Sequence, residues 1–136
     1  MSYIDEHEIR VRYAETDQMG VAYYANYLVW FEVGRSAFCR SLGFSYAEME
    51  KATGSYLVVA EAYCRYRSPL LYDRTFFIRT WLRELRSRSM TFGYELVDET
   101  RQTTYASGET KHVVTDRAGR PKKIPQAFHE ILAAAI

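Results

Sequence analysis

The sequence lacks the features that would mark a secreted, membrane-spanning or nucleic-acid-binding protein. Only two cysteines are present, and eighteen basic residues against seventeen acidic ones leave a net charge of +1. Cys39 and Cys64 lack the spacing of a zinc site or disulfide framework, so we interpret both as reduced core residues. A near-neutral chain has no overall field for nucleic acid. No segment approaches membrane-spanning length and the first residues lack an apolar signal region, which predicts a cytoplasmic protein without integral membrane association.

Enough apolar residues are present for one substantial core. The 136 residues are 48% hydrophobic, which predicts a single domain over residues 1–136. Alternating apolar and charged side chains predict a strand over Glu8–Tyr13. After Gly20, apolar residues at helical spacing predict a long helix with Asn26 as its N-cap and Gly43 at its end. A second short helix is expected over residues 46–52.

The second half of the chain changes to the period of strands. Four further strands are expected, near residues 58–67, 74–82, 90–96 and 103–115. In the first of these, Val58 to Tyr66 should present one apolar face. In the last, the small side chains of Ala106, Gly108 and Thr110 suit close approach by the long helix. One strand, a long helix and four strands with short connections predict an α+β fold, a mostly antiparallel sheet with the helix on one face.

Part of the remaining sheet surface carries apolar side chains. Phe77, Trp81 and Val97 lie at alternate positions of their strands, which suggests that another subunit covers them. We therefore expect a homo-oligomer.

One short segment carries a resemblance to a known family. The motif is Tyr13-x-x-Thr16-Asp17-x-x-Gly20-x-x-Tyr23-Tyr24-Ala25-Asn26-Tyr27, followed by LVWFEVGRSAF. It resembles the hotdog-fold acyl-CoA thioesterases of the 4-hydroxybenzoyl-CoA thioesterase type, including the Tol-Pal-associated branch. The resemblance implies an antiparallel five-stranded sheet wrapped around one long central helix. It further implies an acyl-CoA substrate, no cofactor or metal, and a homodimer pairing its sheets edge to edge within a homotetramer.

The same resemblance implies that Asp17 hydrolyses the thioester, either by attacking the carbonyl or by activating a water molecule. Backbone N–H groups at a helix start have no intrahelical acceptor, and those of Tyr24 or Ala25 would stabilise the oxyanion. Many relatives of the Tol-Pal-associated branch have histidine at the position of Tyr24. The Tyr24 side chain either orients water or substrate or only packs against its neighbours, and both interpretations stay open.

Basic loops are the candidates for binding the phosphates of coenzyme A. The expected binding residues are Arg86, Ser87, Arg88, Ser89 and Lys122, with solvated surface charge as the alternative. Two other functions remain open, a thioesterase acting on acyl carrier protein and a non-catalytic acyl-CoA-binding or scaffold protein.

Other chemically capable side chains are given structural interpretations. His7, His112 and His129 are scattered along the sequence, and none stands where a hotdog dehydratase needs its histidine. Glu61 could be a second catalytic carboxylate, but we favour an ion pair with Arg65 or Arg67.

Overall fold

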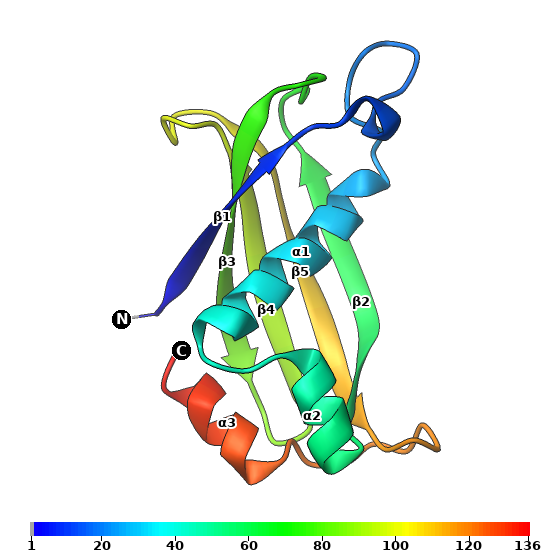
Figure 1. Ribbon diagram of the computed structural model, residues 1–136, viewed down its shortest axis with the longest axis vertical. Coiled ribbons are helices and arrows are strands. Elements are labelled where there is room, and N and C mark those ends of the chain that lie inside the picture. The colour runs from blue at the N-terminus through cyan, green and yellow to red at the C-terminus, as the bar shows by residue number, and fades with distance from the viewer. Residues whose placement is uncertain (1) are drawn as a thin grey trace.

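A computed structural model describes residues 2–136 as one antiparallel sheet of five strands with helices on one side (Figure 1). The strands are β1 (Ile4–Arg10), β2 (Tyr56–Tyr66), β3 (Thr75–Leu85), β4 (Ser89–Val97) and β5 (Thr104–Thr115), in the spatial order β1-β3-β4-β5-β2. The helices are α1 (Asn26–Ser41), α2 (Tyr46–Thr53) and α3 (Gln126–Ala133), with a short 3-10 helix η1 (Tyr13–Glu15). The predicted α+β class with an antiparallel sheet is confirmed.

The longest helix, α1, has 16 residues and crosses one face of the sheet, while α2 and α3 lie near one end of it (Figure 1). As predicted, the helix ends just before Gly43, whose φ of +100° is the left-handed conformation that glycine adopts readily. The predicted N-cap was wrong. Ala25 is the N-cap, and the side chain of Asn26 instead donates a 2.7 Å hydrogen bond to the carbonyl of Glu15.

The contact between α1 and the sheet depends on small residues. Phe31 stacks on Tyr94 of β4, with ring centroids 4.3 Å apart and planes within 4°. A Cβ atom at Gly108 of β5 would lie 2.6 Å from the Phe31 ring, closer than packed atoms can approach. Gly34 on the helix is equally constrained by Ile78. The predicted approach of the helix to the small residues of β5 is therefore confirmed.

Two strand predictions need correction. β1 covers Ile4–Arg10 rather than Glu8–Tyr13, because the chain leaves the sheet after Arg10 and turns into η1. In β2 the register shifts between Val59 and Glu61, as at a β-bulge. Leu57 therefore packs against the core, whereas Val58, predicted on the apolar face, is 46% exposed.

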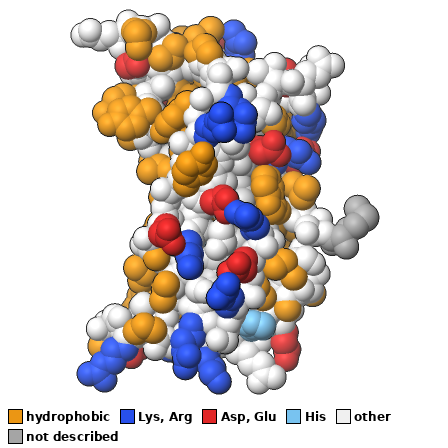
Figure 2. All heavy atoms as spheres, turned by 180° about the vertical axis from the view of Figure 1, so that it is seen from behind, with side chains coloured by type: hydrophobic (Ala, Val, Ile, Leu, Met, Phe, Trp, Pro, Cys, Tyr) orange, Lys and Arg blue, Asp and Glu red, His pale blue; other side chains and the backbone are white. Residues whose placement is uncertain are grey.

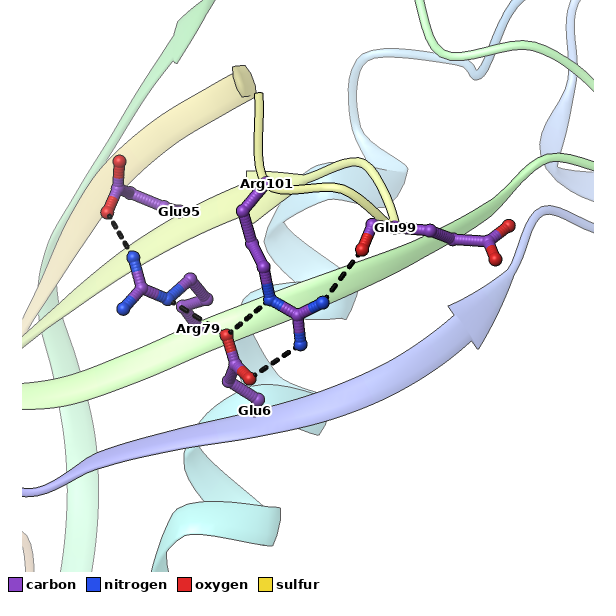
Figure 3. Close-up of polar contacts among 5 residues, drawn as sticks. All are labelled: Glu6, Arg79, Glu95, Glu99 and Arg101. Carbon is purple, nitrogen blue, oxygen red and sulfur yellow. Dashed lines mark hydrogen bonds and ion pairs between the residues drawn. The ribbon is translucent and has the colours of Figure 1, made fainter. Parts of the chain in front are cut away.

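The face of the sheet opposite α1 is crossed by paired charges, and Figure 2 shows acidic and basic side chains alternating down its middle. Glu6 contacts Arg101 at 2.7 Å and Arg79 at 3.2 Å, and Arg79 also pairs with Glu95 at 3.6 Å (Figure 3). The hydrogen bond from Arg101 is the main cause that lowers the pKa of the Glu6 carboxyl. These contacts tie the edge strand β1 to β3, β4 and the loop after β4.

Some of the apolar surface assigned to a subunit contact is covered within the chain. Val97 is buried, and the Arg101 guanidinium lies 4.5 Å from the centroid of the Phe77 ring. Trp81 lies directly over Gly93, where a Cβ atom would be only 2.5 Å from the indole. For Val97, and in part for Phe77, the chain itself thus provides the cover that the sequence analysis assigned to another subunit.

The two edges of the sheet differ. β1, with the sequence IDEHEIR, is short and rich in charge, which protects an edge from pairing with another chain. β2 is 11 residues long, and Val58, Val59 and Tyr63 are each about half exposed along it. Its outer edge has no partner among the described strands.

Candidate active site

Asp17 lies in a tight loop between η1 and α1. Its N–H donates to the carbonyl of Val21 at 2.9 Å, its carbonyl accepts from Gly20 at 3.0 Å, and Thr16 forms a bridge with Ala22. Gly20 has a φ of +79°, a conformation that glycine adopts without strain. The sequence therefore forms a small hairpin that carries Asp17 and returns directly to the start of α1.

The carboxylate of Asp17 is half-buried and only partly engaged. Its Oδ1 accepts a 2.8 Å hydrogen bond from the N–H of Met19, the usual contact of an aspartate in a turn. Within residues 2–136, its Oδ2 has no hydrogen-bond or ion-pair partner. One oxygen thus holds the loop, and the other is available for chemistry.

Glu15 joins this hairpin to α1. Its buried carboxylate accepts hydrogen bonds from the indole N–H of Trp30 at 3.0 Å and from the backbone N–H of Arg12 at 2.8 Å. Its carbonyl accepts from the side chain of Asn26 and from the N–H of Tyr23 at 2.8 Å. The sequence analysis did not single out Glu15, because a glutamate beside a candidate aspartate carries no signal of burial.

The start of α1 leaves two donors unused. Ala25 occupies the N-cap and has no polar side chain with which to cap the helix. The N–H groups of Asn26 and Tyr27 donate back to the carbonyls of Tyr23 and Tyr24. In the described part of the chain, the N–H groups of Tyr24 and Ala25 have no acceptor. Both are the groups that the sequence analysis expected to bind an oxyanion.

The surface around these groups consists of two hollows. One, of about 510 Å³, is lined by Tyr13, Ala14, Thr16, Asp17 and Gln18. The other, of about 270 Å³, is lined by Val21, Ala22, Tyr24, Tyr27, Tyr66, Arg67, Ser68 and Pro69. Asp17 and Tyr24 therefore belong to neighbouring hollows rather than to one closed pocket of the single chain. The Tyr24 ring lies 4.7 Å from that of Tyr23 and is 61% exposed, so most of its surface is open to a ligand.

The predicted coenzyme A residues lie at the opposite end of the sheet. Arg86 to Arg88 form the turn between β3 and β4, and Ser89 pairs with Val113 near the end of β5. Tyr66, which contacts the start of α1, pairs with Ala106 near the beginning of β5. Seven residues of strand separate these positions, about 23 Å at 3.3 Å per residue. Within one chain the two predicted groups are not brought together.

Later segments of the chain hold the carbonyls of this distant turn. The carbonyls of Ser87 and Arg88 accept from Ile124 and Val114 at 2.8 and 2.9 Å. Arg86 pairs with Glu84, and the half-buried Lys122 reaches the carbonyl of Thr53 at 3.3 Å. The side chains of Ser87 and Arg88 are exposed, so they can meet a ligand from outside the chain.

The remaining candidates have structural surroundings. His112 is fully buried, its Nε2 lies 2.7 Å from the hydroxyl of Thr110, and burial, helped by the charge of Arg35, lowers its pKa to about 3. Glu61 lies 3.9 Å from Lys111, so its ion-pair partner is not Arg65 or Arg67 as predicted.

The cysteines agree with their sequence interpretation. Both are free, and burial raises the pKa of Cys39 to about 11. Over the described range 2–136, no cluster of histidine, cysteine, aspartate and glutamate could hold a metal ion, and no helix is long and apolar enough to cross a membrane.

Comparisons with known proteins agree with this architecture. Residues 11–132 match the model of the thioesterase-like superfamily. YneP of Bacillus subtilis, whose name assigns it provisionally as an acyl-CoA thioesterase, is 36% identical over 93% of this chain and 91% of its own length. The acyl-CoA thioesterase YbgC of Haemophilus influenzae is 28% identical over 90% of this chain and 93% of its own.

The solved structures include a similar enzyme. The DHNA-CoA thioesterase of Staphylococcus aureus has 31% identity and a TM-score of 0.90, with 96% of this chain and 89% of that chain covered. The family match spans most of the chain, including the hairpin of Asp17 and all of α1. The chain therefore belongs to the thioesterase-like superfamily, whose members have the hotdog fold.

Proposed function

We propose that the protein is an acyl-CoA thioesterase that hydrolyses an acyl-CoA thioester to the free acid and coenzyme A. The observation that carries the proposal is the pair of unused N–H groups of Tyr24 and Ala25, at the end of the same hairpin that holds Asp17 with one free carboxylate oxygen. The names of YneP, YbgC and the Staphylococcus aureus enzyme support the thioester of coenzyme A as the substrate class.

The chemistry needs a nucleophile at the thioester carbonyl and donors for the oxygen that becomes negative. Asp17 either attacks the carbonyl, which expels the coenzyme A thiolate and leaves an anhydride for water to hydrolyse, or removes a proton from an attacking water molecule. In both routes the carbonyl oxygen accepts hydrogen bonds from Tyr24 or Ala25. The positive end of the α1 dipole adds up to about 2 kcal/mol of favourable interaction there.

A second copy of the chain is part of this proposal. β2 offers a long edge without a partner among the described strands, and its exposed Val58 and Val59 would be covered by an antiparallel copy of the same strand. The pairing makes a homodimer, and we propose that two dimers form a tetramer. Because the two copies of β2 run in opposite directions, the Tyr66 end of one chain lies beside the Tyr56 end of the other.

This arrangement gives the distant basic turn a role. Arg86, Ser87, Arg88, Ser89 and Lys122 of one chain would bind the phosphates of a coenzyme A whose thioester lies at the helix start of the other chain. Lys122 contacts the carbonyl of Thr53, close to the beginning of β2. In the proposed pair this end of β2 lies beside the Tyr66 end of the other chain, which supports the assignment. The free cysteines are those of a protein in a reducing compartment, and we propose the cytoplasm as its location.

Replacing Asp17 by asparagine tests the proposal. The asparagine carbonyl can still accept from the N–H of Met19, so the hairpin is preserved while the negative charge is lost. We expect Asp17→Asn to lower kcat by about 10³-fold, as for loss of a catalytic acid–base group or nucleophile. Thiol release from a panel of aliphatic and aromatic acyl-CoA thioesters is the measurement, with acyl carrier protein thioesters as a second panel.

Asp73→Asn is the matched control, because it changes an exposed aspartate of the neighbouring loop and should leave kcat near the wild-type value. Unchanged hydrolysis in Asp17→Asn contradicts the assigned chemistry. Wild-type protein that binds acyl-CoA without releasing coenzyme A contradicts the enzymatic function itself.

A further inference from the structure

Tyr66, the last residue of β2, contacts the backbone at the start of α1. Its hydroxyl donates a 2.9 Å hydrogen bond to the carbonyl of Tyr24, and its ring packs edge-on against Tyr27, with centroids 4.8 Å apart and an angle of 82°. Both contacts join residues about 40 positions apart in the sequence. The strand thus holds the first turn of the helix at the peptide that follows Tyr24.

The geometry of that peptide links Tyr66 to the unused donors. In a trans peptide the C=O of one residue and the N–H of the next point in opposite directions. The carbonyl of Tyr24 accepts from the Tyr66 hydroxyl and from the N–H of Tyr27 at 3.3 Å, so two donors fix its direction. The N–H of Ala25 must therefore point the opposite way, out of the first turn of α1.

The hydrogen bond also acts through the electrons of the peptide. A donor on a carbonyl withdraws density from the amide and polarises its N–H, an effect estimated at about 10–30% per bond in hydrogen-bonded chains. Burial, with the neighbouring Cys64 as the next cause, raises the pKa of Tyr66 to about 12. The Tyr66 hydroxyl is therefore protonated and able to donate at neutral pH.

We propose that Tyr66 is a positioning residue that orients and polarises the Ala25 N–H as an oxyanion donor. This inference rests on the proposed thioesterase function, since it concerns the residue that holds the peptide of the oxyanion donor. The Tyr66 side chain moves no proton and forms no bond with the substrate. It sets the direction and the strength of the hydrogen bond that the Ala25 N–H donates to the thioester oxygen as that oxygen becomes negative in the transition state.

Tyr66→Phe removes the hydroxyl and keeps the ring against Tyr27. We expect kcat to fall by about two- to tenfold, the effect of losing one hydrogen bond that supports the transition state. KM, and the affinity for a non-hydrolysable thioether analogue of the best acyl-CoA substrate, should stay within about twofold of wild type. Tyr3→Phe is the control, because it also removes a tyrosine hydroxyl that donates a hydrogen bond, here to Asp5 at 3.2 Å beside the opposite edge strand, and it should leave kcat, KM and the melting temperature unchanged.

The amide of Ala25 gives a readout that does not depend on activity. In Tyr66→Phe, NMR should show an Ala25 N–H resonance shifted from its wild-type position, while Tyr3→Phe matches wild type. An unchanged kcat, an unchanged Ala25 resonance, or a raised KM at constant kcat overturns the role of Tyr66. If wild-type protein hydrolyses no acyl-CoA thioester, the proposed function fails, and the Ala25 resonance still decides whether Tyr66 holds this peptide.

Discussion

The two ends of the sheet differ in the side chains that surround their unpaired backbone N–H groups. At the end marked by Tyr66, the N–H groups of Tyr24 and Ala25 find no acceptor among the described residues. At the other end, the N–H groups of Ser87 and Arg88 likewise find no acceptor among the described residues, while their carbonyls accept from Ile124 and Val114. All four residues are exposed, so water can reach their N–H groups, and each can bind a ligand oxygen in its place. The first pair starts a helix beside the hairpin of Asp17 and the second lies in a basic turn, and the proposal therefore gives chemistry to the first end and the binding of phosphate to the second.

The strongest way to break this comparison is to remove one of the unused donors. Tyr24 is the second residue of the turn closed by the hydrogen bond from Asn26 to Tyr23, a position that proline favours. Tyr24→Pro removes the N–H and the side chain, whereas Tyr24→Ala removes the side chain alone. If the Tyr24 N–H binds the oxyanion, we expect proline to lower kcat about 10²-fold more than alanine, the usual effect of losing one such donor.

The measurement is the steady-state hydrolysis of the same acyl-CoA by both variants, with circular dichroism to verify that each is folded. The alanine variant also separates the two interpretations of the Tyr24 side chain, since a ring that only packs contributes little to kcat. Equal kcat values in the two variants would assign the oxyanion contact to Ala25 instead.

The opposite end should respond in stability rather than in rate. Buried His112 has a pKa of about 3 in the folded chain, against about 6.5 when unfolded, so between these values the unfolded state binds an additional proton. The free energy of unfolding therefore falls as the pH drops from 6.5 toward 3, by about 1.4 kcal/mol per unit from this group. Between pH 7.5 and pH 5 the expected loss is about 2 kcal/mol.

Urea denaturation of wild type and His112→Gln at the two pH values measures this contribution. The variant should lose about 2 kcal/mol less than wild type on acidification, whatever its stability at pH 7.5. The same acid-induced loss in both proteins would contradict a neutral buried imidazole at His112.

The smallest expected effect concerns the basic turn. Replacing Arg88 and Lys122 together by alanine should raise KM for acyl-CoA about three- to tenfold, because exposed ion pairs to phosphate contribute about 0.2–1 kcal/mol each. The value of kcat should change less than twofold. Hydrolysis at low and high salt is the measurement, since the difference in KM should shrink as salt screens the charges.

Arg117→Ala is the control for the turn, because it removes an exposed positive charge from the loop after β5. A KM equal to that of wild type in the double variant would remove this end of the sheet from the binding of coenzyme A. The end of the sheet that carries the basic turn would then contribute to stability, through His112, and not to the binding of substrate.

The local patterns of the sequence predicted most of the fold. The long helix, its end at Gly43, the four later strands and the small residues of β5 were all recognisable, because these features depend on periodicity and on the lack of a side chain at glycine. Errors occurred where a neighbour distant in sequence decides. Asn26 donates to Glu15 instead of capping its own helix, and the bulge near Ala60 changes which residues of β2 face the core.

The candidate site shows the same division. Asp17 and the N–H groups of Tyr24 and Ala25 were identified from one contiguous segment, because the motif and the free donors of a helix start are local features. Glu15 was missed since its burial depends on Trp30, fifteen residues later. The contact of Tyr66 with the carbonyl of Tyr24 was missed because the two residues are 42 positions apart.

The sequence by itself determined that the chain folds as a helix on an antiparallel sheet and that Asp17 precedes a helix start. These properties follow from side-chain periodicity and backbone geometry over a few residues. Only the tertiary structure decided that Tyr66 contacts the peptide after Tyr24, and that the basic turn lies about 23 Å along the sheet from it. The physical reason is that these contacts join segments far apart in the sequence. The contact of Tyr66 with Tyr24 spans 42 positions and the pairs of β2 with β5 span 40 to 59, and no local pattern specifies that register.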